Sequence, residues 1–550
     1  MRRLAALLLA CITALLCCTG CGKGGEDENK GAGHSFSYTL VGNPDTLDPQ
    51  LAVSASAKTV LANLFEGLLK LDADGTLQNG VAESYTVSDD QLHYYFKLRS
   101  DCYWYDAKAK DGEFGDEAKR AVSAMDFVYA FQRIFDPVYQ SPYRDMYACL
   151  ANAKEISEGQ LDPSMIGVYA HKEDELEFEL SYPNTGFLLL LTATAALPCN
   201  ADYFAETGGR YGLDEDSVIG NGSFALQRWL YDPYGKYNVV QMVRNPLNHA
   251  VRRVYPVDLN FFIEDQDSDA ARIFTEGSAD CYVSTNSNLI TRTEYSAAGA
   301  HSITLGLIPN PDSQFADASM LQALSLSLDR SSIHPEGDDI ITAGGIIPPA
   351  ADLLNKSCRE LISDGAYNTF NWEAADQAYQ KALRHLRVSE PDDGHILVPA
   401  GMMDYTALKD ITDQWGAMLG VHLVIEEVTE QEYDARLNAK DYTLALYTVT
   451  GEYHDAASVL ESFISDDVLH CSAEKKVRNL LKEAASAPNL TDCVELYRQA
   501  EAAILEDNCF IPLFYKKRYL VCKRGVSDVV FNPFSGQVTF DQAKYDDSET

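Results

Sequence analysis

The sequence predicts an α/β fold that is divided into more than one domain. Stretches in which apolar residues recur at helical spacing alternate with short apolar stretches typical of strands, and this alternation indicates α/β lobes. The chain has 550 residues. That length exceeds what one hydrophobic core organises, so we expect two or three domains.

The first 35 residues differ in composition from the rest of the chain. Two arginines precede an apolar run from Leu4 to Cys18, which is the layout of a secretory signal peptide. The run is shorter than the roughly 20 residues of a membrane-spanning helix. Because CTGC (18–21) resembles the lipobox of bacterial lipoproteins, we predict a signal peptide over 1–20 and lipid attachment at Cys21. The alternatives are a plain secretory leader and a C-x-x-C redox pair. Residues 21–35, rich in glycine and charge, predict a flexible linker.

The segment 36–110 is predicted to consist mostly of strands. Its aromatic stretches YTLVGN, LHYYFKLR and YWY are bounded by turn residues, as strands are. The acidic stretch 106–121 then predicts an exposed hairpin or loop. Ser123, with Asp126 three positions later, matches a capping box and predicts the start of a helix that Pro137 ends.

Helices and strands alternate again in the second half of the chain. SDAARIFTEGSADCYV predicts a helix that stops at Gly277 and a strand after it. Leu408 begins a run of apolar residues at helical spacing that ends at Gly420, and the strand VHLVIEEV follows. DYTLALYTV predicts another strand. Thr491 is predicted to cap a helix that ends near Glu506, before the buried strand FIPLFY.

Composition excludes nucleic acid as a partner. The net charge of −38 repels nucleic acid and anionic lipid head groups, so we expect membrane contact through the lipid anchor only.

Nine cysteines lie beyond the leader, an odd number, and they are scattered without any C-x-x-C pair. This spacing predicts no zinc site and assigns no disulfide.

Catalytic and metal-binding motifs are incomplete in this chain. Four acidic residues between Asp265 and Glu276 match an EF-hand loop, but Ala270 stands where its sharp turn needs glycine. Ser472 and Lys475 match S-x-x-K without the S-D-N and K-T-G motifs that accompany it in β-lactamases. H-E-x-x-H, G-x-S-x-G and the Walker loop do not occur. We therefore predict a binding protein without enzymatic activity, metal or cofactor.

Ten short segments carry a resemblance to a known family. They are PDTLDP (44–49), NLFEGLLKLDADG (63–75), AESY (82–85), YYFKLR (94–99), VSAMDFVYAFQRIFDP (122–137), QSPY (140–143), NGSFALQRW (221–229), LQALSLSLDR (321–330), QWGAMLGVHLVI (414–425) and GEYHDAASVL (451–460). In this order they resemble the oligopeptide- and dipeptide-type extracytoplasmic solute-binding proteins of ABC importers, the bacterial family 5. The resemblance covers nearly the whole mature chain.

The resemblance implies a two-lobe periplasmic-binding-protein fold, the Venus flytrap, with an extra domain inserted in the first lobe. Two strands cross between the lobes in such a fold. The implied boundaries are 36–65, 201–303 and 515–550 for the first lobe, 66–200 for the inserted domain and 304–514 for the second lobe.

The resemblance also implies a function. A lipid-anchored monomer would capture peptides outside the cytoplasmic membrane, at the cell surface or in the periplasm, and deliver them to a permease driven by ATPase subunits. Pairing with the ligand backbone as an added strand would hold peptides of varied sequence. The alternatives are the same transport role for an oligosaccharide, a nickel chelate or a signalling peptide, and, from a different class, a cell-surface hydrolase or folding factor.

Ligand contacts follow from the resemblance position by position. The two segments that face the peptide backbone fall on Val53, Ser54 and Ala55 and on Thr448, Val449 and Thr450. Glu452 takes the place of the acidic residue that holds the peptide's α-ammonium, and Tyr143 that of a ligand-contacting tyrosine. Core packing for Tyr143 and a solvated loop carboxylate for Glu452 are the alternatives.

Three positions depart from the family pattern. Glu430 and Val449 replace aromatic residues that wall side-chain pockets in well-known members, and Thr450 replaces a cysteine that forms a bridge in some. The departures leave the length and side-chain preference of the peptide open.

Overall fold

The structure is a computed structural model that describes residues 33–545, apart from 74, 109–119, 236, 286–294, 336, 354–355, 363–368 and 467. The predicted signal peptide, the predicted lipid attachment at Cys21 and most of the acidic stretch 106–121 lie outside the described residues. Within the described ranges, no helix has both the length and the apolar character needed to cross a membrane.

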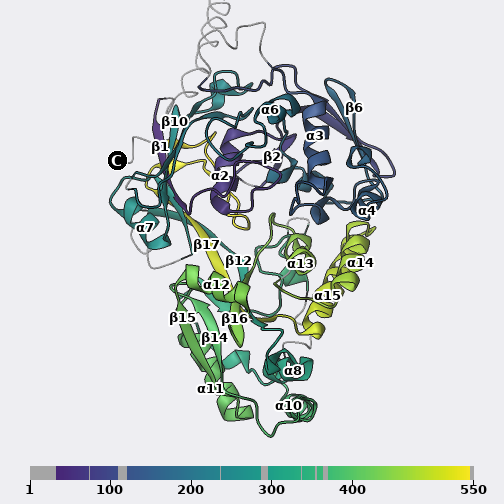
Figure 1. Cartoon of the computed structure of the whole chain (residues 1–550), viewed down its shortest axis with the longest axis vertical. Helices are drawn as coiled ribbons and strands as arrows, with labels where there is room; N and C mark the ends of the chain where they lie inside the picture. Colours follow the sequence, from purple (N-terminus) through teal and green to yellow (C-terminus); the bar gives the residue numbers. More distant parts are fainter. Residues whose placement is uncertain are drawn as a thin grey trace, which may run out of the picture.

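One sheet runs the length of the molecule and joins eleven of the described strands (Figure 1). Its order is β15 (Leu423–Val428), β14 (Gly394–Pro399), β16 (Leu444–Val449), β12 (Tyr295–Pro309), β17 (Ile511–Lys523), β11 (Cys281–Ser284), β1 (Ser35–Val41), β10 (Asp258–Glu264), β9 (Val239–Arg244) and β8 (Phe224–Leu230), with β13 (Ile340–Thr342) beside β17.

The long strands β12 and β17 connect the two halves of the molecule. They pair antiparallel, and one of two register shifts between them lies between His301 and Ile303. Such a shift marks a β-bulge, which bends a strand locally. We call residues 33–302 and 517–545 the upper half and residues 303–516 the lower half, as in Figure 1.

The upper half carries a second sheet and most of one hydrophobic core. The second sheet has the order β4 (Ala82–Val87), β5 (His93–Leu98), β7 (Glu175–Glu179) and β6 (Val168–Lys172). Helices of this half are α2 (Ala55–Leu64), α3 (Ala124–Phe135), α4 (Ala153–Ser157), α5 (Phe187–Leu190), α6 (Ala201–Glu206) and α7 (Asp267–Thr275). The two-stranded pairs are β2 (Leu69–Leu71) with β3 (Leu77–Asn79), β18 (Val526–Ser527) with β21 (Lys544–Tyr545), and β19 (Val530–Phe531) with β20 (Val538–Thr539). Because Phe36, Leu61 and Phe178 belong to one buried cluster, the second sheet and the main sheet share a core.

The lower half packs helices against parallel strands. β14 pairs parallel with both β15 and β16. The helices are α8 (Ala318–Leu326), α9 (Cys358–Leu361), α10 (Trp372–Leu386), α11 (Thr406–Leu419), α12 (Glu430–Ala439), α13 (Ala456–Ser465), α14 (Glu474–Ala485) and α15 (Leu490–Asp507). Two buried clusters form on the sheet, one around Trp415 and one around Phe463 and Tyr497.

Several elements predicted from local patterns are confirmed. α3 begins at Ala124, and Ser123 and Asp126 form the predicted capping box. α11 ends at Gly420, whose φ of +70° is a left-handed conformation that glycine adopts without strain. α7 stops before Gly277, and strand β11 follows it.

Other local predictions are wrong. Asn489, not Thr491, caps α15, because its side chain accepts a hydrogen bond from the backbone N–H of Asp492. The YWY segment forms only isolated bridges at Tyr103 and Tyr105. The segment 36–110 also contains α2, of which only Ala55 and Ala62 are not buried. Burial on nearly every side removes the amphipathic spacing that marks a surface helix in a sequence.

A buried ion pair joins the PDTLDP segment to α3. Arg133 Nη1 donates to Asp48 Oδ1 at 3.0 Å and to Gln50 Oε1 at 2.8 Å, and Nη2 bonds the other carboxylate oxygen. The two charged side chains are only 1% and 3% exposed, and the ring of Phe204 lies 4.2 Å from the guanidinium carbon. The pair therefore fixes α3 to the loop that precedes α2.

Arg133→Met should lower the free energy of unfolding of the upper half by about 3–5 kcal/mol, because it leaves the Asp48 carboxylate buried without its cation. Urea unfolding followed by circular dichroism measures the loss. Arg120→Met is the matched control, since Arg120 pairs with Glu206 at 3.1 Å with side chains 36% and 60% exposed. An exposed pair of this kind contributes about 1 kcal/mol or less. Equal losses in both variants would contradict a structural role for the buried pair.

Candidate ligand-binding site between the two halves

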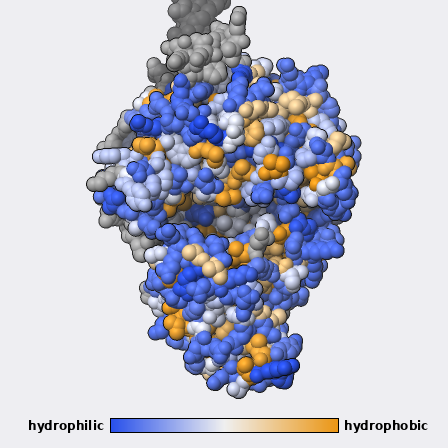
Figure 2. All heavy atoms as spheres, in the orientation of Figure 1, coloured by the Kyte–Doolittle hydropathy of each residue, from blue (hydrophilic) through white to orange (hydrophobic). Residues whose placement is uncertain are grey.

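A cavity of about 690 Å³ lies between the upper and lower halves. Figure 2 shows a hollow in the surface between the upper and lower halves. The upper wall includes Tyr143, Met146 and Tyr182, and the lower wall comes from the end of β16 and from α13 and α14. The volume is within the range of roughly 300–1,000 Å³ that is typical of sites for small ligands.

The structure brings half of the predicted ligand contacts to this cavity. Val53, Tyr143, Thr450 and Glu452 line it. The remaining four predicted contacts, Ser54, Ala55, Thr448 and Val449, are not among the lining residues.

Strand β16 has an unpaired edge close to the cavity. On its β14 side the pairing involves only Leu444 and Ala445, and no other described strand continues it. The carbonyl of Leu446 points to this edge, because it accepts a hydrogen bond from the Tyr433 hydroxyl at 2.8 Å. Backbone groups alternate along a strand, so Thr448 presents its N–H and C=O at the same edge. Its neighbour Tyr447 lines the cavity.

The opposing predicted segment forms the start of α2. Ser54 caps this helix, and Ala55 is its first residue. The backbone N–H groups of Val53 and Ser54 donate to the Asp45 carboxylate at 3.0 and 3.3 Å. The side chain of Val53, 56% exposed, is the part of this segment that faces the cavity.

Tyr143 packs in the core with part of its surface on the cavity. It is 6% exposed, and its hydroxyl donates to the carbonyl of Ala52. Burial raises the pKa of this hydroxyl far above its ordinary value, and the negative charge of Glu452 raises it further. Tyr143 therefore remains a neutral donor that shapes the upper wall.

Glu452 is neither free nor fully solvated. Lys58 Nζ lies 2.6 and 2.7 Å from its two carboxylate oxygens. The Lys58 side chain is 5% exposed and that of Glu452 is 34% exposed. Lys58 also lies 5.9 Å from the centre of the Tyr143 ring. The carboxylate thus lines the cavity together with the cation that it pairs with.

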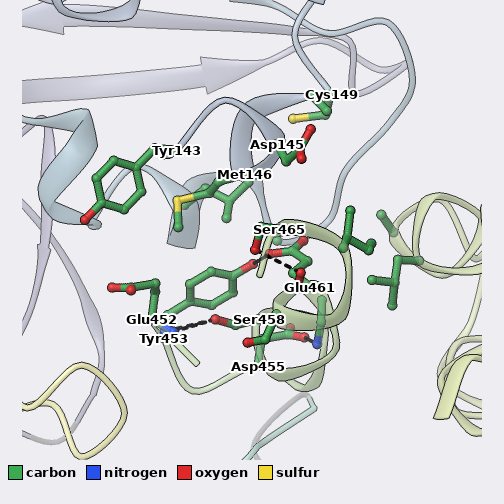
Figure 3. A pocket seen from close by; sticks show the side chains of 18 of the residues that line it. Tyr143, Asp145, Met146, Cys149, Glu452, Tyr453, Asp455, Ser458, Glu461 and Ser465 are labelled. Atoms are coloured by element: carbon green, nitrogen blue, oxygen red, sulfur yellow. Dashed lines mark hydrogen bonds between the residues drawn. The ribbon is translucent and has the colours of Figure 1, made fainter. Parts of the chain in front are cut away.

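A second group of acidic residues forms the floor of the cavity (Figure 3). Asp455 caps α13 and accepts a hydrogen bond from the Tyr497 hydroxyl at 3.1 Å. Glu461 accepts one from the Tyr453 hydroxyl at 3.4 Å, and no salt bridge to it is found within the described residues. Burial, with the negative charge of Asp455 adding to it, raises the pKa of Glu461 to about 7. This carboxyl is therefore poised to take or release a proton near neutral pH.

Polar contacts join the halves at the rim of the cavity. Arg478 of α14 lies 3.0 Å from Asp145 of the upper half. The carbonyl of Ala485 accepts the N–H of Thr185 at 3.1 Å. Lys482 lies 4.3 Å from the centre of the Tyr182 ring. These contacts close one side of the site.

One group within the described residues has donor atoms close enough to hold a metal ion. Atoms of Cys471, Asp507 and Cys509 lie within 4.8 Å of one another. The Asp507 carboxylate already accepts the backbone N–H of Ser472 at 2.8 Å, and none of the three residues lines the cavity. The group is therefore separate from the ligand site.

The sequence analysis missed Lys58, Asp145, Met146, Tyr453 and Glu461. Lys58 follows the predicted contact segment by only a few positions, but a single lysine in a helix gives no sign of its partner. A weak signal for the floor existed in and just after GEYHDAASVL, where Asp455 and Glu461 follow Glu452 within ten positions.

The fold and the cavity between its halves are those of the two-lobe class of binding proteins. Residues 76–468 match the family described as bacterial extracellular solute-binding proteins, family 5, middle part. The chain belongs to this family.

Known relatives match almost end to end. The probable deoxycholate-binding periplasmic protein YgiS of Escherichia coli K12 is 26% identical over 503 residues, which are 88% of each chain. The oligopeptide-binding protein OppA of Bacillus subtilis is 21% identical over 548 residues and covers 96% of this chain and 95% of its own. A solved structure of the pheromone receptor PrgZ superposes with a TM-score of 0.75 at 22% identity, covering 93% of this chain and 99% of that one. These matches confirm the predicted two-lobe fold.

Glu461→Gln should remove a pH-dependent loss of stability. The folded protein raises the pKa of Glu461 from 4.5 to about 7. It therefore binds the proton more tightly than the unfolded chain, and stability falls as the pH rises through that interval. Glutamine has no proton to lose. The variant should match wild type near pH 4 and exceed it by roughly 1–3 kcal/mol near pH 8.

Melting temperatures measured across this pH range test the prediction. Glu495→Gln is the control, because a hydrogen bond from Arg498 lowers the pKa of exposed Glu495 to about 2 and so predicts the opposite sign. A difference between wild type and Glu461→Gln that stays constant with pH would contradict the role of Glu461.

Proposed function

We propose that this chain captures peptides outside the cytoplasmic membrane and delivers them to the permease of an ABC importer. The observation that carries the proposal is the unpaired edge of β16 close to the cavity, where Thr448, between the lining residues Tyr447 and Thr450, presents a backbone donor and acceptor. A peptide that adds a strand there is held through its own backbone, which every sequence shares. A receptor of this design serves many peptides.

The remaining predicted contacts fit around such a strand. Val53 offers an apolar surface and Thr450 a side chain on the lower wall, and Tyr143 closes the upper wall. Glu452 is proposed to meet the amino-terminal end of the peptide. Closure of the halves around the ligand is a hinge motion in which the ligand shifts the population toward the closed state.

The proposal treats the chain as a binding protein and not an enzyme. We also propose that a signal peptide exports it and that lipid at Cys21 anchors it to the outer face of the membrane as a monomer.

Names of relatives support peptides as ligands, since OppA of Bacillus subtilis is named for oligopeptides. The name of YgiS, for deoxycholate, keeps another solute as the alternative. A steroid has no backbone to pair with β16, which favours the peptide.

Peptides of about two to eight residues should raise the melting temperature by several degrees at ligand concentrations far above Kd. Solution scattering should show that the particle becomes more compact at the same time. A response to deoxycholate, an oligosaccharide or a nickel chelate, with none to any peptide, would instead support the alternative.

Thr448→Pro then tests the mode of binding with the best peptide from that screen. Proline removes the N–H on the unpaired edge without removing a bond to β12, so the protein should fold. Peptide affinity should fall by a factor of about ten, the value of one net hydrogen bond. Thr448→Ala keeps the N–H and should bind like wild type. Unchanged affinity in Thr448→Pro would exclude strand addition at this edge.

Cys21→Ser tests the anchor. Without the thiol no lipid is attached, so the protein should move from the membrane fraction to the soluble fraction. Cell fractionation with immunoblotting measures this, and Cys17→Ser serves as a control that leaves Cys21 intact. Membrane retention of the Cys21→Ser protein would contradict the lipoprotein assignment.

A further inference from the structure

The pair between Lys58 and Glu452 occupies the place proposed for the amino-terminal end of the ligand. Both carboxylate oxygens lie within 2.7 Å of the lysine nitrogen. The lysine is almost fully buried, and the carboxylate is the more exposed partner. A ligand that reaches Glu452 therefore meets a carboxylate whose charge is already balanced by Lys58, which also lines the cavity.

A second cation of the chain adds to this balance. Burial lowers the pKa of Arg518 in β17 to about 10, and the negative charge of Glu452 opposes that shift, so the two groups interact. The guanidinium of Arg518 donates to the carbonyl of Pro533 at 2.9 Å. Lys58 forms the ion pair with Glu452, and Arg518 attracts the carboxylate from beyond ion-pair distance. A ligand ammonium would bring a third cation into a partly buried site, where like charges repel more strongly than in water.

The backbone around Glu452 is fixed on both sides. Its N–H donates to Ser458 Oγ at 2.7 Å, and its carbonyl accepts a hydrogen bond from Asn532 Nδ2 at 2.9 Å. A Cβ atom at Gly451 would lie 2.8 Å from Ser458 Oγ, so this close approach requires glycine. If Glu452 turned from Lys58 to a ligand ammonium, the lysine would remain buried and unpaired, which is costly.

The cavity offers an apolar surface as well as this neutralised pair. Val53, Pro142 and Met146 line it. Figure 3 shows Tyr143 and Met146 on the opposite side of the cavity from Glu452. A carboxylate offers about four acceptor positions, so one that is paired with lysine still accepts an amide N–H. An acylated amino terminus supplies both an amide N–H and an apolar group.

We propose that Lys58 is a built-in counter-ion that lets the site take peptides whose amino terminus is acylated and uncharged. The inference rests on the proposed peptide-binding function and keeps Glu452 as the contact for that end of the peptide. Glu452 then accepts a hydrogen bond from the first amide N–H and does not require an ion pair with the ligand. Lys58 is the residue that sets this specificity.

Two peptide pools of identical sequences, one with free amino termini and one N-acetylated, test the inference by titration calorimetry on the full chain. Wild type should bind the two forms of a matched peptide within about threefold of each other. Lys58→Met removes the cation that balances Glu452. This variant should bind the free amine more tightly than the acetylated peptide by a factor of about ten or more. Lys58→Arg keeps the counter-ion and should keep the wild-type ratio.

Lys172→Met is the matched control, because Lys172 also pairs with a carboxylate, at 2.7 Å from Glu175 Oε1, but does not line the cavity. Its ratio of affinities for the free and N-acetylated peptides should equal that of wild type. A preference of wild type for free amines by about tenfold or more overturns the inference and leaves the peptide function intact. The inference is also overturned if folded Lys58→Met has the same ratio of affinities for the free and N-acetylated peptides as wild type. If Lys58→Met does not fold, the ratio of affinities measured for wild type still tests the inference. If neither pool binds, the proposed function is overturned, and this inference with it.

Discussion

The antiparallel pairing of β12 with β17 is the constraint on which the site depends. These two strands run through both halves, and the bulge beside Ser302 lies where they pass from one half to the other. Ser302 Oγ donates to the carbonyl of Pro533, and Thr450 Oγ1 donates to the carbonyls of Ser302 and Phe534. The end of β16 is therefore held to the crossing point itself.

The contacts across the rim are of a different kind from the cores. The upper core and the two lower clusters are apolar, whereas Arg478 and Asp145 meet as an ion pair with side chains 39% and 45% exposed. Exposed pairs each contribute about 1 kcal/mol or less. Such contacts at the rim therefore add little to the stability of the molecule. The rim and the apolar clusters therefore differ in how strongly they hold their elements together.

The site differs from a simple cation receptor in the way its charges are arranged. Two acidic residues of the floor, Asp455 and Glu461, have carboxyl pKa values raised by burial, so the chain itself disfavours their negative charge. Glu452, in contrast, has its own lysine. Val449, which replaces an aromatic residue of the family pattern, is 1% exposed and lies in the lower core. Val449 therefore does not wall the cavity, and Thr450 is the departure from the family pattern that lines it.

Local sequence determined much of this protein. The capping box at Ser123, the stop at Gly420 and the alternation of helices with strands act over a few residues, and they predict α3, α11 and the α/β class. Family segments added the two-lobe fold and the positions of Val53, Tyr143, Thr450 and Glu452 at the cavity. Only the tertiary structure decided the rest. Helix α2 is hidden in the sequence because it is buried on nearly every side. Lys58 and Glu452 are 394 positions apart, and no local pattern pairs them. Their charges meet only because β12 and β17 bring the two halves together.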